Sequence, residues 1–299
     1  MPLRYDMPLF RPPSEGDNLI IQATLGCSFN RCSFCSMYRS KDYRARPVAD
    51  VAADIAAAAR VWPDAHRVFL ADGDAMGLPT DTLLDLCARL RAAFPALQRI
   101  SAYATPANLL KKTPEELAAL KAARLSLVYV GIESGDPGVL RRITKGATAE
   151  GIVTAVTKAK AAGLKVSATV ILGLGGESRW REHIAGTAAV LNACAPTYAS
   201  TLQLFLQEER VEDFLDTWNR RADPGETFIP RDDAGILEEL ELLLESLAPP
   251  QPVIFRSNHA SNALPLAGTL GKDRDRLLAA VRAARQGALA VRPRWRRGL

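Results

Sequence analysis

Residues 125–172 read LSLVYVGIESGDPGVLRRITKGATAEGIVTAVTKAKAAGLKVSATVIL. This stretch contains two strand-like segments separated by a helical pattern. Leu125–Ile132 and Lys165–Leu172 are short, apolar and rich in β-branched residues, which predicts buried strands. Thr148–Ala162 has helical periodicity and is followed by Gly163, a residue that tolerates the left-handed backbone at helix ends. A strand, a helix and a second strand in this order predict a parallel pair joined by a right-handed crossover.

The same alternation extends along the chain in both directions. Further strands are expected at Asn18–Leu25, Arg67–Ala71, Gln98–Tyr103, Tyr198–Leu206 and Val253–Arg256. Further helices are expected at Val48–Val61, at Thr80–Phe94 with Thr80 as its cap, after a capping box at Thr113–Glu116, at Glu177–Ala193, at Ile236–Leu247 and at Asp273–Arg285. About six strand–helix units predict an α/β fold of parallel strands, either a partial (β/α)6-type TIM barrel or an open doubly wound sheet.

Composition limits the class of protein. The chain has 299 residues, of which 48% are apolar and 24% charged, so it can form a large core and is not disordered. No run approaches ~18 apolar residues, and the N-terminus lacks the pattern of a signal peptide, so a cytoplasmic location is expected. We expect an N-terminal arm (1–17), a core barrel (18–250) and, after the prolines at 249–252, a C-terminal strand and helix extension (251–299) with a basic tail.

The net charge of +5 belongs to that tail. Residues 282–299 contain six arginines and no acid, whereas the rest has 32 basic and 33 acidic groups. The body of the protein is therefore nearly neutral. The tail is interpreted as a solvated, disordered terminus in preference to a contact for RNA or an acidic partner.

Three of the five cysteines, Cys27, Cys32 and Cys35, lie within nine residues after the first predicted strand. Their spacing is C-x4-C-x2-C, in a loop at the end of the strand where parallel α/β folds build their sites. Core packing does not explain three cysteines in a polar loop, and zinc would need a fourth ligand that no nearby Cys or His supplies. An iron–sulfur cluster is favoured; three thiolates would leave one iron of a [4Fe–4S] cluster open.

The cysteine loop resembles that of the radical S-adenosylmethionine (SAM) superfamily, with Phe34 as the aromatic residue before the last cysteine. The first gap has four residues where that motif usually has three. The resemblance implies that Cys27, Cys32 and Cys35 hold an oxygen-sensitive [4Fe–4S] cluster whose open iron binds SAM. Reductive cleavage would then yield a 5'-deoxyadenosyl radical that abstracts a hydrogen from a small-molecule substrate, with flavodoxin or ferredoxin as electron donor.

Segments at the ends of later strands extend the resemblance. Gly131–Gly135 reads Gly-Ile-Glu-Ser-Gly, similar to the branch that includes oxygen-independent coproporphyrinogen oxidases and tRNA methylthiotransferases. The Leu-Ala-Asp-Gly-Asp segment (70–74) stands where members of the superfamily have residues that contact the SAM ammonium group. The Gly173–Glu177 segment stands where their backbone lies beside the adenine of SAM. The residues for which the resemblance implies contact with SAM are Tyr38, Asp72, Asp74, Glu133, Ser134, Gly173, Gly175, Arg256 and Asn258.

A polar run, Phe255–Asn262, accompanies the last predicted strand. Four of its residues could bind substrate or the SAM carboxylate: Arg256, Asn258, His259 and Asn262. Tyr103 and His259 are the candidate catalytic residues. Cys87 and Cys194 are expected in the core, so a second cluster is not expected. Two alternative functions stay open: a non-catalytic iron–sulfur sensor or electron carrier, and a zinc-stapled RNA-binding protein.

Overall fold

A computed structural model describes residues 3–298. The chain forms two compact units. The first contains the chain up to Asn30, Met37–Val130 and Lys158–Val166, and the second contains Arg31–Ser36, Gly131–Thr157 and the chain from Ser167 onward. The division falls inside the cysteine loop, so Cys27 lies in the first unit and Cys32 and Cys35 lie in the second.

The first unit contains parallel strands in the order β1 (Leu19–Gln22), β4 (Arg67–Ala71), β5 (Arg99–Ala104) and β6 (Leu125–Glu133), the last of them up to Val130. Its connecting helices are α1 (Val48–Val61), α2 (Thr80–Ala93), α3 (Pro106–Lys111) and α4 (Pro114–Ala122), with short 3-10 turns η1 (Pro13–Glu15) and η2 (Ala75–Gly77). The strands are mostly apolar and mostly buried, with Arg67 exposed at the start of β4, as expected for a sheet covered on both faces.

The predicted strand Asn18–Leu25 is two strands in the structure. β1 pairs with β4, while β2 (Thr24–Leu25) pairs antiparallel with β3 (Arg44–Ala45) in a separate small ribbon. Between them, the Ala23 amide still donates to the Ala71 carbonyl, 2.5 Å away. The cysteine loop therefore leaves from a short ribbon and not directly from the main sheet.

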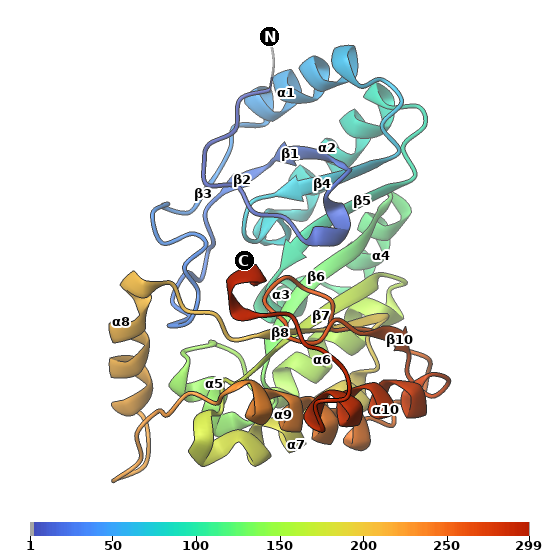
Figure 1. The fold of residues 1–299 in the computed structure, drawn as a ribbon. Helices are drawn as coiled ribbons and strands as arrows, with labels where there is room; N and C mark the ends of the chain where they lie inside the picture. Colours follow the sequence, from blue (N-terminus) through green and yellow to red (C-terminus); the bar gives the residue numbers. More distant parts are fainter. Residues whose placement is uncertain (1–2, 299) are drawn as a thin grey trace. The chain divides into compact units, whose positions relative to one another are not determined.

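The second unit contains β7 (Lys165–Leu172) from Ser167 onward, then β8 (Tyr198–Gln203) and β9 (Ile254–Arg256), all parallel, with β10 (Ala267–Thr269) antiparallel beside β9. Its helices are α5 (Pro137–Arg142), the first part of α6 (Ala149–Ala161), α7 (Gly176–Cys194), α8 (Glu208–Asn219), α9 (Asp233–Ser246) and α10 (Arg274–Arg285), and η3 (Arg294–Arg296) is a final turn. Within this unit α7 packs on α9, and α9 packs on α10, drawn in orange and red in Figure 1.

Parallel strands followed by helices confirm the predicted α/β class and its partial-barrel pattern. The Thr113 capping box is present: the hydroxyl of Thr113 accepts from the Glu116 amide, and the Glu116 carboxylate accepts from the Thr113 amide. The cap expected at Thr80 is wrong, because Thr80 is the first helical residue and Pro79 precedes it without a side-chain cap. No described helix is long and apolar enough to cross a membrane.

Two C-terminal elements differ from expectation. Helix α8 and strand β10 have no predicted counterpart. The arginine-rich tail is also partly docked: Arg292 donates to the carbonyls of His259 and Ala260 at 3.0 Å, and Arg297 forms two bonds with Asp233 at 2.7 and 2.8 Å. The interpretation as a wholly solvated terminus is therefore wrong, although Trp295 remains 77% exposed.

Candidate active site

Cys27 lies against a glycine that no larger residue could replace without movement. A Cβ on Gly73 would be 2.8 Å from the Cβ of Cys27, 2.8 Å from the Gly26 carbonyl and 2.9 Å from the ring of Tyr38. Real side chains do not approach so closely, so the absent side chain lets β4's turn meet the cysteine loop. The predicted residues Cys27, Tyr38 and the 72–74 turn are thus brought together within the first unit.

Asp72 is a fully buried carboxylate with its partners inside the protein. Its Oδ2 is 3.0 Å from the Lys41 ammonium and 3.3 Å from the Gly26 amide. Burial raises the pKa of Asp72 above its ordinary value, and the bond from Lys41 opposes that rise. Asp72 therefore joins β4 to both ends of the cysteine loop.

Asp74 is equally buried and binds the residue that follows Cys27. Its carboxylate accepts from the Ser28 amide at 2.9 Å, from the Ser28 hydroxyl, and from Asn108 Nδ2 at 3.5 Å. Burial raises the pKa of Asp74, with the two bonds from Ser28 opposing it. The geometry makes Asp74 a cap for the start of the cysteine loop.

The second half of the loop is fastened within the second unit. The Ser33 amide donates to the Ile143 carbonyl at 3.0 Å, and the Cys35 amide donates to the Cys32 carbonyl at 3.2 Å. Phe34 packs against an apolar cluster made by Val139, Ile143, Ile171, Leu174, Phe214, Trp218 and Phe228. Because Arg210 of α8 also donates to the Ser33 carbonyl at 3.4 Å, the unpredicted helix α8 contacts the loop that bears Cys32 and Cys35.

Glu133 ends β6 in an ion pair that the sequence did not indicate. Its Oε1 is 2.9 Å from the Lys145 ammonium, and both side chains are about nine-tenths buried. Glu133 has a left-handed φ of 66°, and a Cβ on Gly131 would overlap its carboxylate, which gives a physical reason for the Gly-x-Glu pattern. Burial lowers the pKa of Lys145, but the charges of Glu133, Cys32 and Cys35 outweigh it and raise that pKa. A cation thus faces the two thiols.

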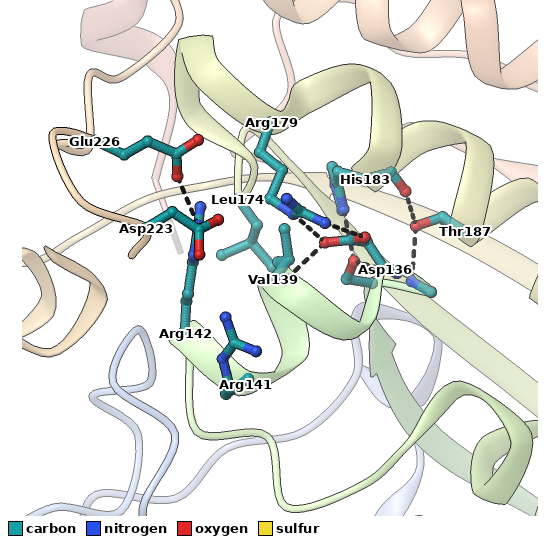
Figure 2. Close-up of polar contacts among 12 residues, drawn as sticks. Asp136, Val139, Arg141, Arg142, Leu174, Arg179, His183, Thr187, Asp223 and Glu226 are labelled. Atoms are coloured by element: carbon teal, nitrogen blue, oxygen red, sulfur yellow. Dashed lines mark hydrogen bonds and ion pairs between the residues drawn. The ribbon is translucent and has the colours of Figure 1, made fainter. Parts of the chain in front are cut away.

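Ser134 belongs to a buried polar network that includes Asp136, Arg179 and His183, which are labelled in Figure 2. The Ser134 hydroxyl is 2.8 Å from His183 Nδ1, and His183 Nε2 is 3.0 Å from the Ile171 carbonyl. Burial lowers the pKa of His183 to about 4, so the ring is neutral near pH 7. Asp136 completes the network by accepting two bonds from Arg179, at 2.7 and 3.1 Å. Ser134 therefore has a structural partner in His183.

Arg142, in the short helix α5, is a fully buried arginine. Its guanidinium is 3.0 Å from Asp223 and 2.6 Å from Glu226, and it lies 4.4 Å from the Trp218 ring centroid. Figure 2 shows both acids reaching it from the segment that follows α8. This buried cation attaches the segment after α8 to α5.

The glycine-rich turn after β7 is tightly packed. Gly173 has a φ of 89°, and its amide donates to the buried carboxylate of Glu239 at 2.7 Å. A Cβ on Gly175 would lie 2.8 Å from the Trp180 Cα. Both predicted glycines therefore occupy positions that only glycine fills without strain or overlap.

The remaining candidates are partly exposed. Tyr103 stacks edge-on against Phe69 at 5.1 Å and Tyr129 at 6.1 Å. In the second unit, Arg256 lies 5.1 Å from the Tyr198 ring, and His259 Nδ1 is 2.8 Å from the Ser261 hydroxyl.

Two more residues of the polar run have opposite surroundings. Asn258 is exposed. Asn262 is buried and donates to the Thr201 carbonyl at 2.7 Å and to the Ser257 hydroxyl at 3.0 Å. Asn262 thus holds the loop, while Asn258 presents its amide to solvent.

Thiolates are the ligands that an iron–sulfur cluster prefers, and all three cysteines of the motif are partly exposed. Among residues 3–298, neither unit contains three Cys, His, Asp or Glu side chains grouped so that they could hold a metal ion. Cys27 belongs to the first unit, and Cys32 and Cys35 belong to the second. Cys87 and Cys194 are buried, as expected. The donor chemistry and the Lys145 cation beside two of the thiols suit an anionic cluster.

Sequence reasoning missed Lys41, Lys145, His183 and Glu239, each a buried partner of a predicted residue or segment. Lys145 lies in the stretch Arg-Arg-Ile-Thr-Lys-Gly (141–146), twelve residues after its partner Glu133. The other three lie far in sequence from the groups they contact, and no local pattern distinguishes them.

Comparison with known proteins places the chain in context. The family model for the radical SAM superfamily matches residues 21–188. A curated protein of Methanocaldococcus jannaschii, named "Putative methylthiotransferase", is 28% identical over 186 residues, which cover 57% of this chain and 39% of that protein. The chain thus matches well under half of that relative's length.

Among solved structures, coproporphyrinogen III oxidase of Escherichia coli, a radical SAM enzyme, has a TM-score of 0.56 at 18% identity, covering 77% of this chain and 52% of its own. Truncated Elp3 of Methanocaldococcus infernus has a TM-score of 0.52 at 13% identity, covering 91% of this chain and 64% of its own. At these identities the likeness is one of fold.

Proposed function

The chain belongs to the radical SAM superfamily, and from this premise we propose that it cleaves SAM reductively and uses the resulting radical on a small-molecule substrate. It is an enzyme of that superfamily, whose members use a [4Fe–4S] cluster and SAM. When bound, the reduced cluster supplies the electron that breaks the sulfonium bond of SAM and yields the 5'-deoxyadenosyl radical.

The observation that supports the proposal most strongly is the triad of thiols, Cys27, Cys32 and Cys35. We propose that they ligate three irons and that SAM takes the fourth. Gly73 admits the 72–74 turn against Cys27, while Phe34 and the Ser33 amide anchor the other two cysteines. The extra residue of the C-x4-C gap lies within this anchored loop.

The surrounding residues are proposed to divide into two groups. Asp72, Asp74 and Ser134 are buried with protein partners, so we propose that they shape the loops and do not contact SAM. The proposed contacts with SAM are Tyr38, Glu133, the Gly173–Glu177 turn, Arg256 and Asn258.

The methylthiotransferase name of the relative is not proposed for this chain. Beyond the motif, the sequence contains only Cys87 and Cys194, which are isolated and buried. Two such cysteines cannot hold a second cluster, for which four thiolates are usual. We propose that these 299 residues hold a single cluster, with flavodoxin or ferredoxin as electron donor and a cytoplasmic location as predictions.

The test is anaerobic reconstitution with iron and sulfide, followed by dithionite and SAM. We expect absorbance near ~400 nm, which oxygen bleaches, and formation of 5'-deoxyadenosine measured by mass spectrometry. The Cys27→Ala/Cys32→Ala/Cys35→Ala variant should lose both signals, whereas Cys87→Ala should keep both.

The rival functions give different results in the same experiment. A cluster without 5'-deoxyadenosine indicates a sensor or electron carrier. A colourless protein that retains zinc and is indifferent to oxygen indicates a zinc-stapled protein, and either result would sink the proposal.

A further inference from the structure

Glu239 is a carboxylate of helix α9 buried beside the turn that follows β7. Its side chain is fully buried, and its Oε2 accepts the Gly173 amide at 2.7 Å. The Gly176 amide closes the same turn onto the Gly173 carbonyl at 3.1 Å. Glu239 therefore holds the first amide of a turn in which the backbone of Gly173 is left-handed.

A single arginine links this carboxylate to the far side of the turn. Arg231 Nη1 is 3.6 Å from Glu239 Oε1, and Arg231 Nε is 3.6 Å from Glu177 Oε1. The guanidinium stacks 4.1 Å from the Trp180 ring centroid and is 5% exposed. The beginning and the end of the Gly173–Glu177 turn thus share one network of charges.

Arg231 is not a full counter-ion for Glu239. Its closest carboxylate is Glu238 at 2.6 Å, so its charge is divided among Glu177, Glu238 and Glu239. The other Glu239 oxygen, Oε1, has no hydrogen-bond partner among the described residues. A buried carboxylate with incomplete compensation resists ionisation.

Burial accordingly raises the pKa of Glu239 to about 7, with the Gly173 amide and Arg231 opposing the rise and Glu177 adding to it. Of the other charged groups on the packed helices, Arg285 of α10 lies 3.8 Å from Glu238, and His183 of α7 has a pKa of about 4. The pKa of His183 thus lies below the range from pH 6 to 8, whereas the pKa of Glu239 lies within it.

We propose that Glu239 is a positioning residue for SAM: its ionised carboxylate fixes the Gly173–Glu177 turn in the form that binds the cofactor. Protonation removes the attraction to Arg231 and weakens the bond from the Gly173 amide, because ionised acceptors make the stronger hydrogen bonds. The inference rests on the proposed function, in which this turn contacts SAM. It adds Glu239, a residue outside the turn, as the group that fixes the conformation of the turn.

The experiment measures equilibrium binding of SAM to reconstituted protein without reductant, by calorimetry under anaerobic conditions at pH 6, 7 and 8. Because apparent affinity scales with the fraction of competent protein, the wild-type Kd should be about tenfold weaker at pH 6 than at pH 8. Glu239→Gln keeps an acceptor oxygen without a charge, so its Kd should not change with pH. Glu239→Leu should bind weakly at every pH.

A second readout does not need the cofactor. Hydrogen–deuterium exchange of peptides covering residues 173–177 should be faster in Glu239→Leu than in wild type, without SAM. Glu241→Gln is the matched control, because Glu241 is on the same helix but pairs with Arg282 and Arg285, away from the turn. It should retain the wild-type pH dependence and exchange.

The outcomes separate the two proposals. If wild type binds SAM with a pH-independent Kd, or if Glu239→Leu binds SAM and exchanges as wild type does, the role of Glu239 is overturned and the proposed function stands. If wild type neither binds nor cleaves SAM, the proposed function fails; unchanged exchange in Glu239→Leu would then overturn the positioning of the turn separately.

Discussion

Gly73 shows how much one missing side chain decides at the residue scale. A methyl group there would meet the Cys27 side chain and the Gly26 carbonyl at 2.8 Å, and the backbone atom cannot rotate away. We expect Gly73→Ala to destabilise the fold by about 1–3 kcal/mol and to lower iron incorporation on reconstitution. Thermal unfolding and iron content per chain measure both. Gly298→Ala, with nothing within 4 Å of the added carbon, is the control; equal iron content in the two variants would contradict the prediction.

At the scale of the element, α8 is a helix attached through two aromatic side chains. Phe214 and Trp218 are fully buried, and Trp218 packs on Phe228 at 5.2 Å and on the Arg142 guanidinium. We expect Trp218→Ala to cost about 3–5 kcal/mol and to expose residues 207–230 to limited proteolysis. Because Phe34 packs on the same group of apolar side chains, the variant should also retain less of the reconstituted iron–sulfur cluster. Trp295→Ala removes an exposed tryptophan and should change none of these; an intact 207–230 segment in Trp218→Ala would refute the role of α8.

Elements also show where sequence reasoning ends. The capping box at Thr113 and the strand Lys165–Leu172 are local patterns, and both are present in the structure. Helix α8 was missed although Val211, Phe214, Leu215 and Trp218 stand at the spacing of an amphipathic helix; half of its sequence, EERVEDFLDTWN, is charged. Its contact with Arg142, which stacks on Trp218 and pairs with Asp223 after the helix, is a tertiary contact that no local pattern indicates. The cysteines were found because their spacing within nine residues is a local pattern, and that pattern indicates cluster ligands without knowledge of tertiary contacts.

For the whole molecule, two of the buried groups with shifted pKa values change the stability with pH in opposite directions. His183 has a pKa lowered to about 4, so it stabilises the fold near neutral pH and this is lost as pH falls from about 6.5 to about 4. Glu239 has a pKa raised to about 7, so its contribution is greatest below about 4.5 and is lost as pH rises to about 7. Each shift corresponds to roughly 3 kcal/mol. Their effects should largely cancel between pH 4.5 and 6.5.

Single variants reveal the two slopes. With Glu239→Gln, His183 remains and the Tm should rise with pH between 4.5 and 6.5. With His183→Gln, Glu239 remains and the Tm should fall over the same range. Differential scanning calorimetry measures both, and parallel Tm curves for the two variants would disprove the assignment.

The attachment of residues 207–230 has a consequence for how such a protein diversifies. The polar contacts of this segment include the ion pairs of Asp223 and Glu226 with the Arg142 guanidinium. Its apolar contacts are those of Phe214, Trp218 and Phe228 in the apolar cluster described above. A segment of different length or composition could be grafted there, provided that it supplied an acidic pair and two aromatic anchors. The strands and the short helix α5 could then stay unchanged while the grafted segment varied, so residues 207–230 could be exchanged as a unit.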